Sequence, residues 1–179
     1  IPFSIDDCVL DYQVLKQDAP KKEMSILLAA VKRDLVNSRI KLLADLGVHP
    51  EVMDLDIFCL INAFQALYPE HQEKQVGLLN IGHTLSSFAI LDQELPVFVR
   101  EIASGGSGVT KALSEIKAVP EADADALKIK KPQEEEAALK AAAKKGFESL
   151  SEEIRQSIDY VENEMKEELK KIYVSGGGS

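Results

Sequence analysis

The sequence predicts an α/β fold, and three observations carry the prediction. Apolar runs of strand length are interspersed with longer stretches in which apolar residues recur at helical spacing. Turns that contain glycine follow three of the strand-like runs, near residues 82, 105 and 176. A chain of 179 residues with 45% hydrophobic content is long enough to bury a sizeable core, in one large domain or two small ones.

Two strands are expected first. Residues 7–16 mix alternating polarity with β-branched and aromatic side chains, which suits a strand. Residues 23–31 are nearly all apolar, which predicts a strand buried on both faces. A turn around Pro20 separates the two runs, so an antiparallel hairpin is the simplest pairing.

Two helices follow, with a short strand between them. Apolar residues from Leu35 to Leu46 recur at helical spacing, and Gly47 is placed to end that helix in a left-handed conformation. Residues 52–55 read as a short strand. Asp56 is placed to cap a helix over residues 57–67, and this helix is expected to be buried because it is apolar almost all round.

The second half of the chain begins with strands and continues with helices. From residue 121 to 171 good helix formers dominate, and Pro132 and Gly146 divide the stretch. Apolar residues spaced three and four apart after Gly146 predict a long amphipathic helix, with Ser151 as an alternative start. The remaining elements are strands at 75–81, 85–92, 96–102 and 172–174 and a helix at 107–117.

Composition excludes several classes of function. The formal net charge of −9 argues against nucleic acid as a partner, since such binding depends on Lys and Arg. No apolar run approaches the ~20 residues that a membrane-spanning helix needs. Cys8 and Cys59 are expected to be buried reduced thiols of a cytosolic protein, and the three scattered histidines form no ligand set of metal-site spacing.

The three glycine turns are the candidate functional feature. Backbone N–H groups at such turns and at a helix N-terminus lack partners within the chain, so together they form an anion site. Three glycine turns that each follow a strand therefore indicate a nucleotide cleft. The run at the end of the chain, residues 176–178, also reads as a flexible linker.

A family resemblance strengthens this interpretation. The stretch Asn80-Ile81-Gly82-His83-Thr84, followed by residues 98–106 and Thr110, resembles the second half of actin-like ATPases, and among them the PilM family of type IV pilus and type II secretion assembly. The resemblance covers essentially the whole chain, and the order of the motifs is its specific signal. It implies a ribonuclease H-like (actin-like ATPase) lobe with part of a small inserted α+β subdomain. The implied divisions are the inserted subdomain at 1–55, a bridging helix of the first lobe at 56–74, and the second lobe at 75–179 with a helical subdomain at about 118–150.

The resemblance also implies a nucleotide site. It assigns the second phosphate loop to Gly82, His83 and Thr84, and the start of the following helix to Gly105 and Gly106. It assigns the ribose and adenine contacts to Asp125 and Lys128, and the turn beside the base to Gly176 and Gly177. Asn80 stands where relatives carry an Asp that helps to hold hydrated Mg²⁺, so only a weak contact through water is expected there. The family's first phosphate loop would lie before residue 1. We therefore expect a piece of a longer protein, in which ATP and Mg bind only at full length.

The implied function is a cytoplasmic ATP-binding scaffold with weak or no ATP hydrolysis. Its expected partner is the N-terminal cytoplasmic peptide of a PilN-like membrane protein, held near residues 1–55, together with other pilus or secretion assembly proteins. Recruitment to the inner membrane would then be peripheral, and homo-oligomerisation is left open. Two alternatives share the superfamily: an FtsA-like cell-division filament protein, and a small-molecule kinase, which needs a catalytic carboxylate that the turn at residues 80–84 lacks.

Overall fold

The computed structural model of the chain describes residues 4–18, 22–70 and 74–178. The chain divides into two compact units, one up to Asp54 and the other from Leu55 onward. The expected turn around Pro20 lies outside the described residues. Each unit is described by itself below.

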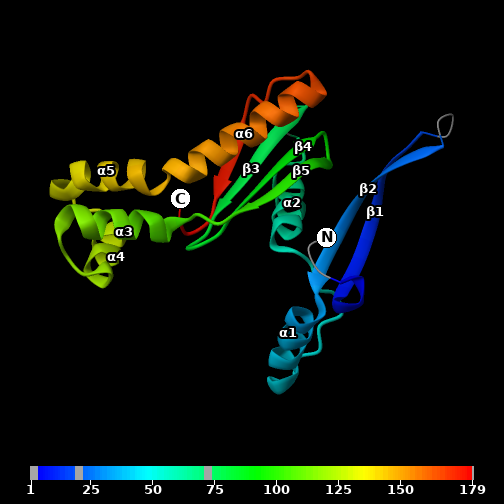
Figure 1. The fold of residues 1–179 in the computed structure, drawn as a ribbon, viewed down its shortest axis with the longest axis horizontal. Coiled ribbons are helices and arrows are strands. Elements are labelled where there is room, and N and C mark those ends of the chain that lie inside the picture. Colours follow the sequence, from blue (N-terminus) through cyan, green and yellow to red (C-terminus); the bar gives the residue numbers. More distant parts are fainter. Residues whose placement is uncertain (1–3, 19–21, 71–73, 179) are drawn as a thin grey trace. The chain divides into compact units, whose positions relative to one another are not determined.

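The first unit is a hairpin followed by a helix. Strands β1 (Cys8–Asp18) and β2 (Glu23–Lys32) pair antiparallel, as predicted, with a bulge between Val14 and Lys16. A short 3₁₀ helix (Ile5–Asp7) precedes β1, and helix α1 (Arg33–Asp45) follows β2 directly (Figure 1).

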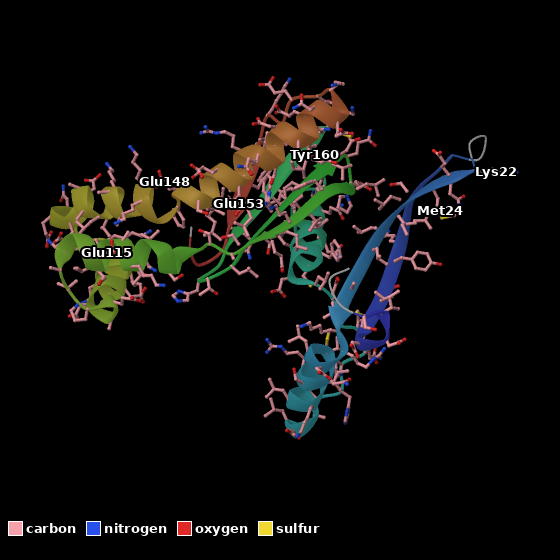
Figure 2. The ribbon with its side chains drawn as sticks, in the orientation of Figure 1. Lys22, Met24, Glu115, Glu148, Glu153 and Tyr160 are labelled. Atoms are coloured by element: carbon pink, nitrogen blue, oxygen red, sulfur yellow. The ribbon has the colours of Figure 1, made fainter. Side chains whose placement is uncertain are left out.

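The prediction that both faces of the second strand are buried is wrong. Along β2 every side chain is exposed or only half-buried, and Met24, labelled in Figure 2, is 61% exposed. In the part of the unit that the structure describes, β2 pairs with β1 alone. An apolar strand with one neighbour keeps its side chains accessible, because two strands do not build a core on either side.

The end of α1 confirms the predicted glycine cap. Gly47 has a φ of +75°, its N–H donates to the Ala44 carbonyl at 2.9 Å, and the Val48 N–H donates to the Leu43 carbonyl at 2.9 Å. This pair of bonds is the Schellman motif, which satisfies carbonyls left open at a helix end. Residues 52–55, in contrast, are not a strand, so that prediction is wrong: among the described residues, this segment belongs to neither of the two sheets.

The second unit contains a four-stranded sheet in the order β5-β4-β3-β6. The first three strands form an antiparallel meander, and β6 returns from the far end of the chain to lie parallel to β3. All four confirm predicted strands. Their bounds are β3 (Gln75–Ile81), β4 (Ser86–Asp92), β5 (Leu95–Ile102) and β6 (Ile172–Ser175).

One helix packs on each face of the sheet, because successive side chains of β3 point to opposite sides. Val76 and Leu78 belong to a core with helix α2 (Asp56–Leu67), whereas Leu79 and Ile81 belong to a core with helix α6 (Glu148–Met165). Figure 1 shows α6 running along the sheet. On this face Arg100 of β5 forms an ion pair with Glu153 of α6, which Figure 2 labels.

Helix α2 is buried on one side only, which corrects the expectation of full burial. Ile57, Ile61 and Phe64 face the sheet, whereas Cys59 is exposed and Leu67 is 74% exposed. A helix on one face of a sheet buries one stripe, and among the described residues nothing covers the rest. The exposed Cys59 also contradicts the expectation of two buried thiols, which holds for Cys8 alone.

The predicted cap of α2 is wrong as well. Asp56 is the first residue of the helix, Leu55 precedes it at the cap position, and no side chain there caps the helix through a hydrogen bond. The carboxylate still lies in the first turn, where a negative charge suits the helix dipole.

A group of three helices completes the second unit. Helices α3 (Gly106–Lys117), α4 (Glu121–Lys130) and α5 (Glu136–Gly146), with a 3₁₀ turn (Gln133–Glu135), enclose a core of their own. Helix α6 begins directly at Glu148, so the alternative start at Ser151 is wrong, and the divisions at Pro132 and Gly146 are confirmed. Among the described helices, none is both long and apolar enough to cross a membrane.

Close contacts hold this helical group together and attach it to the sheet. Within the group, Gly108 of α3 and Gly146 of α5 touch backbone to backbone: a Cβ added at Gly146 would lie 2.5 Å from the Val109 nitrogen. Phe147, between α5 and α6, packs against both the core of the helical group and the core beneath α6.

Candidate functional site

The three glycine turns meet at one edge of the sheet, around the β3–β4 turn. The N–H of Gly106 donates to the Gly82 carbonyl at 2.9 Å, and the N–H of Ser107 donates to the His83 carbonyl at 2.7 Å. From the other side, the N–H of Gly178 donates to the Ile81 carbonyl at 2.9 Å. The turn after β3 is therefore the centre of the cluster.

Sheet topology explains why the turns converge. Since β6 is parallel to β3, with Asn80 opposite Ser175, both strands end at the same edge. The end of β5 is held there by the Ser86 hydroxyl, which donates to the Ser104 carbonyl at 2.7 Å.

Most of the glycines are required because the turns pack against one another. A Cβ at Gly105 would lie 2.5 Å from the Gly82 oxygen, and one at Gly178 would lie 2.6 Å from the same atom. Gly176 has a φ of +99°, in the left-handed region, and its added Cβ would lie 2.3 Å from the Ile81 oxygen. Gly177 differs, because a Cβ there would meet no atom within 4 Å.

The expectation of free donors at the start of α3 needs correction. The sequence predicts that the N–H groups at this helix start, those of Gly106 and Ser107, lack partners within the chain, but the carbonyls of the β3–β4 turn accept both. The helix N-terminus is thus used to dock the turn. Within residues 4–18, 22–70 and 74–178, the backbone N–H groups of His83 and Thr84 have no protein acceptor, and both residues are exposed.

A polar cluster on α3 and α4 lies beside the turn. The Lys128 ammonium is 2.9 Å from Asp125 Oδ1 and donates to Thr110 Oγ1 at 2.7 Å and to the Gly106 carbonyl at 3.2 Å. Three acceptors match the three protons of an ammonium. The Thr110 hydroxyl, on a residue only 5% exposed, in turn lies 3.1 Å from Asp125 Oδ1.

The charge state of Asp125 follows from these contacts. Its hydrogen bonds with Lys128 and then Thr110 hold the pKa of this carboxyl below its usual range, and the positive charge of Lys128 adds to the effect. Desolvation opposes the shift, and the nearby His83 side chain lowers the pKa slightly further. The α4 carboxylate is therefore ionised at neutral pH and lies within electrostatic reach of the turn.

The site residues named from the sequence fall into two groups. The first group lies in the cluster through short contacts and comprises Gly82, Gly105, Gly106, Gly176, Asp125 and Lys128. His83, Thr84 and Gly177 lie at its exposed rim.

Two residues of the cluster, Thr110 and Gly178, belong to the motifs named in the sequence but are not among the predicted site residues. Thr110 follows Gly106 by four residues, the spacing that puts two side chains on one helix face, and that spacing is the signal that could have found it. Gly178 belongs to the same glycine run as Gly176.

The residues at this edge fit magnesium only through water. Asn80 is half-buried, and its amide oxygen lies 3.4 Å from the Ser175 hydroxyl. Among the described residues, no three His, Cys, Asp or Glu side chains gather closely enough to hold a metal ion. A neutral amide is a poor direct ligand for a hard cation, so Asn80 fits a contact to a hydrated ion.

The fold and this junction define a class: a mixed α/β lobe in which three turns meet at one edge of the sheet. A solved structure of a "PilM-PilN type IV pilus biogenesis complex" shares the fold, with a TM-score of 0.81 at 22% identity over 100% of this chain. More remote similarities include the ethanolamine utilization protein EutJ from Carboxydothermus hydrogenoformans (17% identity, TM-score 0.48, 66% of this chain and 40% of that one) and an archaeal actin homolog (11% identity, TM-score 0.43, 87% and 49%).

A comparison of the sequence with models of protein families identifies the family of this chain. The model described as "Type IV pilus assembly protein PilM" matches residues 1–179, so the chain belongs to this family. The chain spans 52% of the length of the PilM structure that it resembles.

Proposed function

We propose that the full-length protein is an ATP-binding scaffold of type IV pilus, or type II secretion, assembly at the inner membrane. The observation that carries the proposal is the junction of three turns, with open N–H groups at His83 and Thr84 and an ionised Asp125 beside them. Family membership supports the pilus assignment over a cell-division filament or a small-molecule kinase.

The exposed rim supplies the groups that a nucleotide requires. The N–H groups of His83 and Thr84, with the Thr84 hydroxyl, would donate to phosphate oxygens, as exposed turn amides do in other anion sites. Asp125 would accept a ribose hydroxyl, and the open side of Gly177 would admit the base. Bound Mg²⁺, held through water on Asn80, would neutralise phosphate charge. With an amide instead of a carboxylate at residue 80, we expect weak hydrolysis or none.

The proposed partner is the short N-terminal cytoplasmic segment of a PilN-like membrane protein. The similar solved structure is that of a PilM-PilN complex, which supports a partner of this kind. Residues 1–55 would contribute to its site. ATP would favour one of two conformations of the full-length protein. The affinity for the partner would then change to the extent that the partner binds the two conformations differently.

Calorimetric titration of Mg-ATP into the full-length protein tests nucleotide binding. We expect micromolar affinity that is lost in Gly82→Val, because even a Cβ at this position would lie 2.5 Å from the Leu85 oxygen. The far-UV circular dichroism spectrum of Gly82→Val is the control for folding. Asp125→Asn keeps the side-chain volume, removes the charge and replaces one acceptor oxygen by an NH2 donor, and it should weaken binding several-fold. Absence of binding to the wild type would leave a nucleotide-independent scaffold.

Titration of the PilN-like peptide with and without ATP tests the coupling. We expect different affinities in the two titrations. Equal affinities would refute the coupling and leave partner binding intact.

A further inference from the structure

Positive charge is scarce at the candidate site. The phosphates of a nucleotide carry several negative charges, and the protein is itself negative, with a formal net charge of −9. The three turns, residues 80–85, 104–108 and 175–178, contain no Lys or Arg in their sequence. The one side chain in them that can become a cation is that of His83.

The nearest lysine is committed to other groups. The ammonium of Lys128 already contacts the Asp125 carboxylate, the Thr110 hydroxyl and the Gly106 carbonyl, which together use its three protons. Its charge is also balanced by Asp125 at 2.9 Å. A phosphate could recruit Lys128 only by replacing one of these three contacts.

The N–H groups at the start of α3 are likewise already hydrogen-bonded. The N–H groups of Gly106 and Ser107 donate to the carbonyls of Gly82 and His83. A helix N-terminus normally offers such donors to an anion. Here they instead fix the backbone of His83 at the rim of the site, where the residue is exposed.

We propose that the imidazole of His83 is the cation that pairs with a bound phosphate chain, so that nucleotide binding takes up a proton. This inference rests on the proposed nucleotide site. An imidazole ordinarily changes charge between pH 5 and 8, so the linkage falls in the physiological range. The charged group that interacts with His83 is the Asp125 carboxylate of α4, which itself pairs with Lys128. The first turn of α3 (106–110) and the turn after β6 (175–178) contain no charged residue.

The sign of the effect follows from linkage. A bound polyanion stabilises protonated His83, so the bound state holds more protons than the free state and affinity rises as pH falls. We expect one charge-assisted contact of this kind to change the affinity about tenfold, which corresponds to about 1.4 kcal/mol.

The test is calorimetric titration of Mg-ATP into the full-length protein at about pH 6 and about pH 8. Because the nucleotide itself can titrate, the readout is the difference between wild type and His83→Gln. We expect about tenfold tighter binding at the lower pH in the wild type and a much smaller change in the variant. Repeating the titration in buffers of different ionisation enthalpy should show proton uptake by the wild type only.

Two further variants complete the design. His83→Arg carries a permanent charge and should bind tightly at both pH values, whereas His49→Gln, in the first unit, should behave as the wild type. Equal pH dependence in wild type and His83→Gln would overturn the inference about His83 while nucleotide binding stands. No binding by the wild type at either pH would overturn both.

Discussion

Replacing Gln75 with Leu should stabilise the protein. Gln75 begins β3, is only 3% exposed, and among the described residues neither its amide nitrogen nor its amide oxygen has a hydrogen-bond partner. Its cross-strand neighbour is Asp92, whose Oδ1 is likewise buried without a partner. An unsatisfied buried polar group costs about 1–3 kcal/mol, and Leu has a similar size. We therefore expect Gln75→Leu to raise the free energy of unfolding by about 1–2 kcal/mol.

The assay is urea denaturation followed by far-UV circular dichroism, with Gln65→Leu as the matched control. Gln65 donates to the Glu94 carbonyl at 2.6 Å, so its replacement should lower the unfolding free energy by about 0.5–1.5 kcal/mol. Gln75→Glu would add a second carboxylate opposite Asp92 and should destabilise more strongly. If Gln75→Leu destabilises as Gln65→Leu does, the amide has a partner such as a buried water, and the reasoning fails.

Two further predictions concern the helical group. Gly146→Ala should lower the free energy of unfolding by about 1–3 kcal/mol, because the methyl would lie 2.5 Å from the Val109 nitrogen. The control Lys145→Met breaks only an exposed ion pair to Glu115 (labelled in Figure 2) and should change the free energy of unfolding by less than about 1 kcal/mol. Equal thermal midpoints for the two variants would contradict the close-contact argument. The folded-state pKa of Asp125 is lowered, so its contribution to stability is present above an ordinary carboxyl pKa of about 4 and is lost as pH falls below it. The difference in thermal midpoint between wild type and Asp125→Asn should accordingly be largest near neutrality and shrink in acid, and a difference that grows in acid would refute the assignment.

Local features of the fold could be predicted from the sequence. The hairpin, the Gly47 cap, the four strands of the sheet and the helix breaks at Pro132 and Gly146 each depend on a few neighbouring residues. Such features are encoded in backbone preferences and in short-range periodicity, so they can be read without knowing what lies nearby.

Burial could not be predicted in the same way. The apolar residues of β2 and α2 could be buried if another element packed over them. Whether another element does so depends on long-range contacts, which an apolar run does not encode. Residues 52–55 illustrate the same limit, since a strand needs a partner strand as well as a suitable composition. The exposed Cys59 follows from this: its apolar neighbours in sequence face a single side of α2.

The candidate site was predictable in its residues and not in its bonding. The glycines that follow three predicted strands indicate where the candidate site lies, and the parallel pairing of β6 with β3 brings two of these turns to one edge of the sheet. The bonds from Gly106 and Ser107 to the β3–β4 turn span more than twenty residues of sequence and depend on the packed fold. Long-range bonds of this kind decide which N–H groups stay open, which is why the open donors lie at His83 and Thr84.

Phe147 limits how freely this part of the chain can vary. A connection between two helices normally tolerates substitution, because loops are exposed and contact little. Phe147 instead packs in two cores at once, one formed by α3, α4 and α5 and the other by α6 and the sheet. A replacement would have to suit both environments, so a mutational scan of residues 144–149 should find position 147 the least tolerant of the connection.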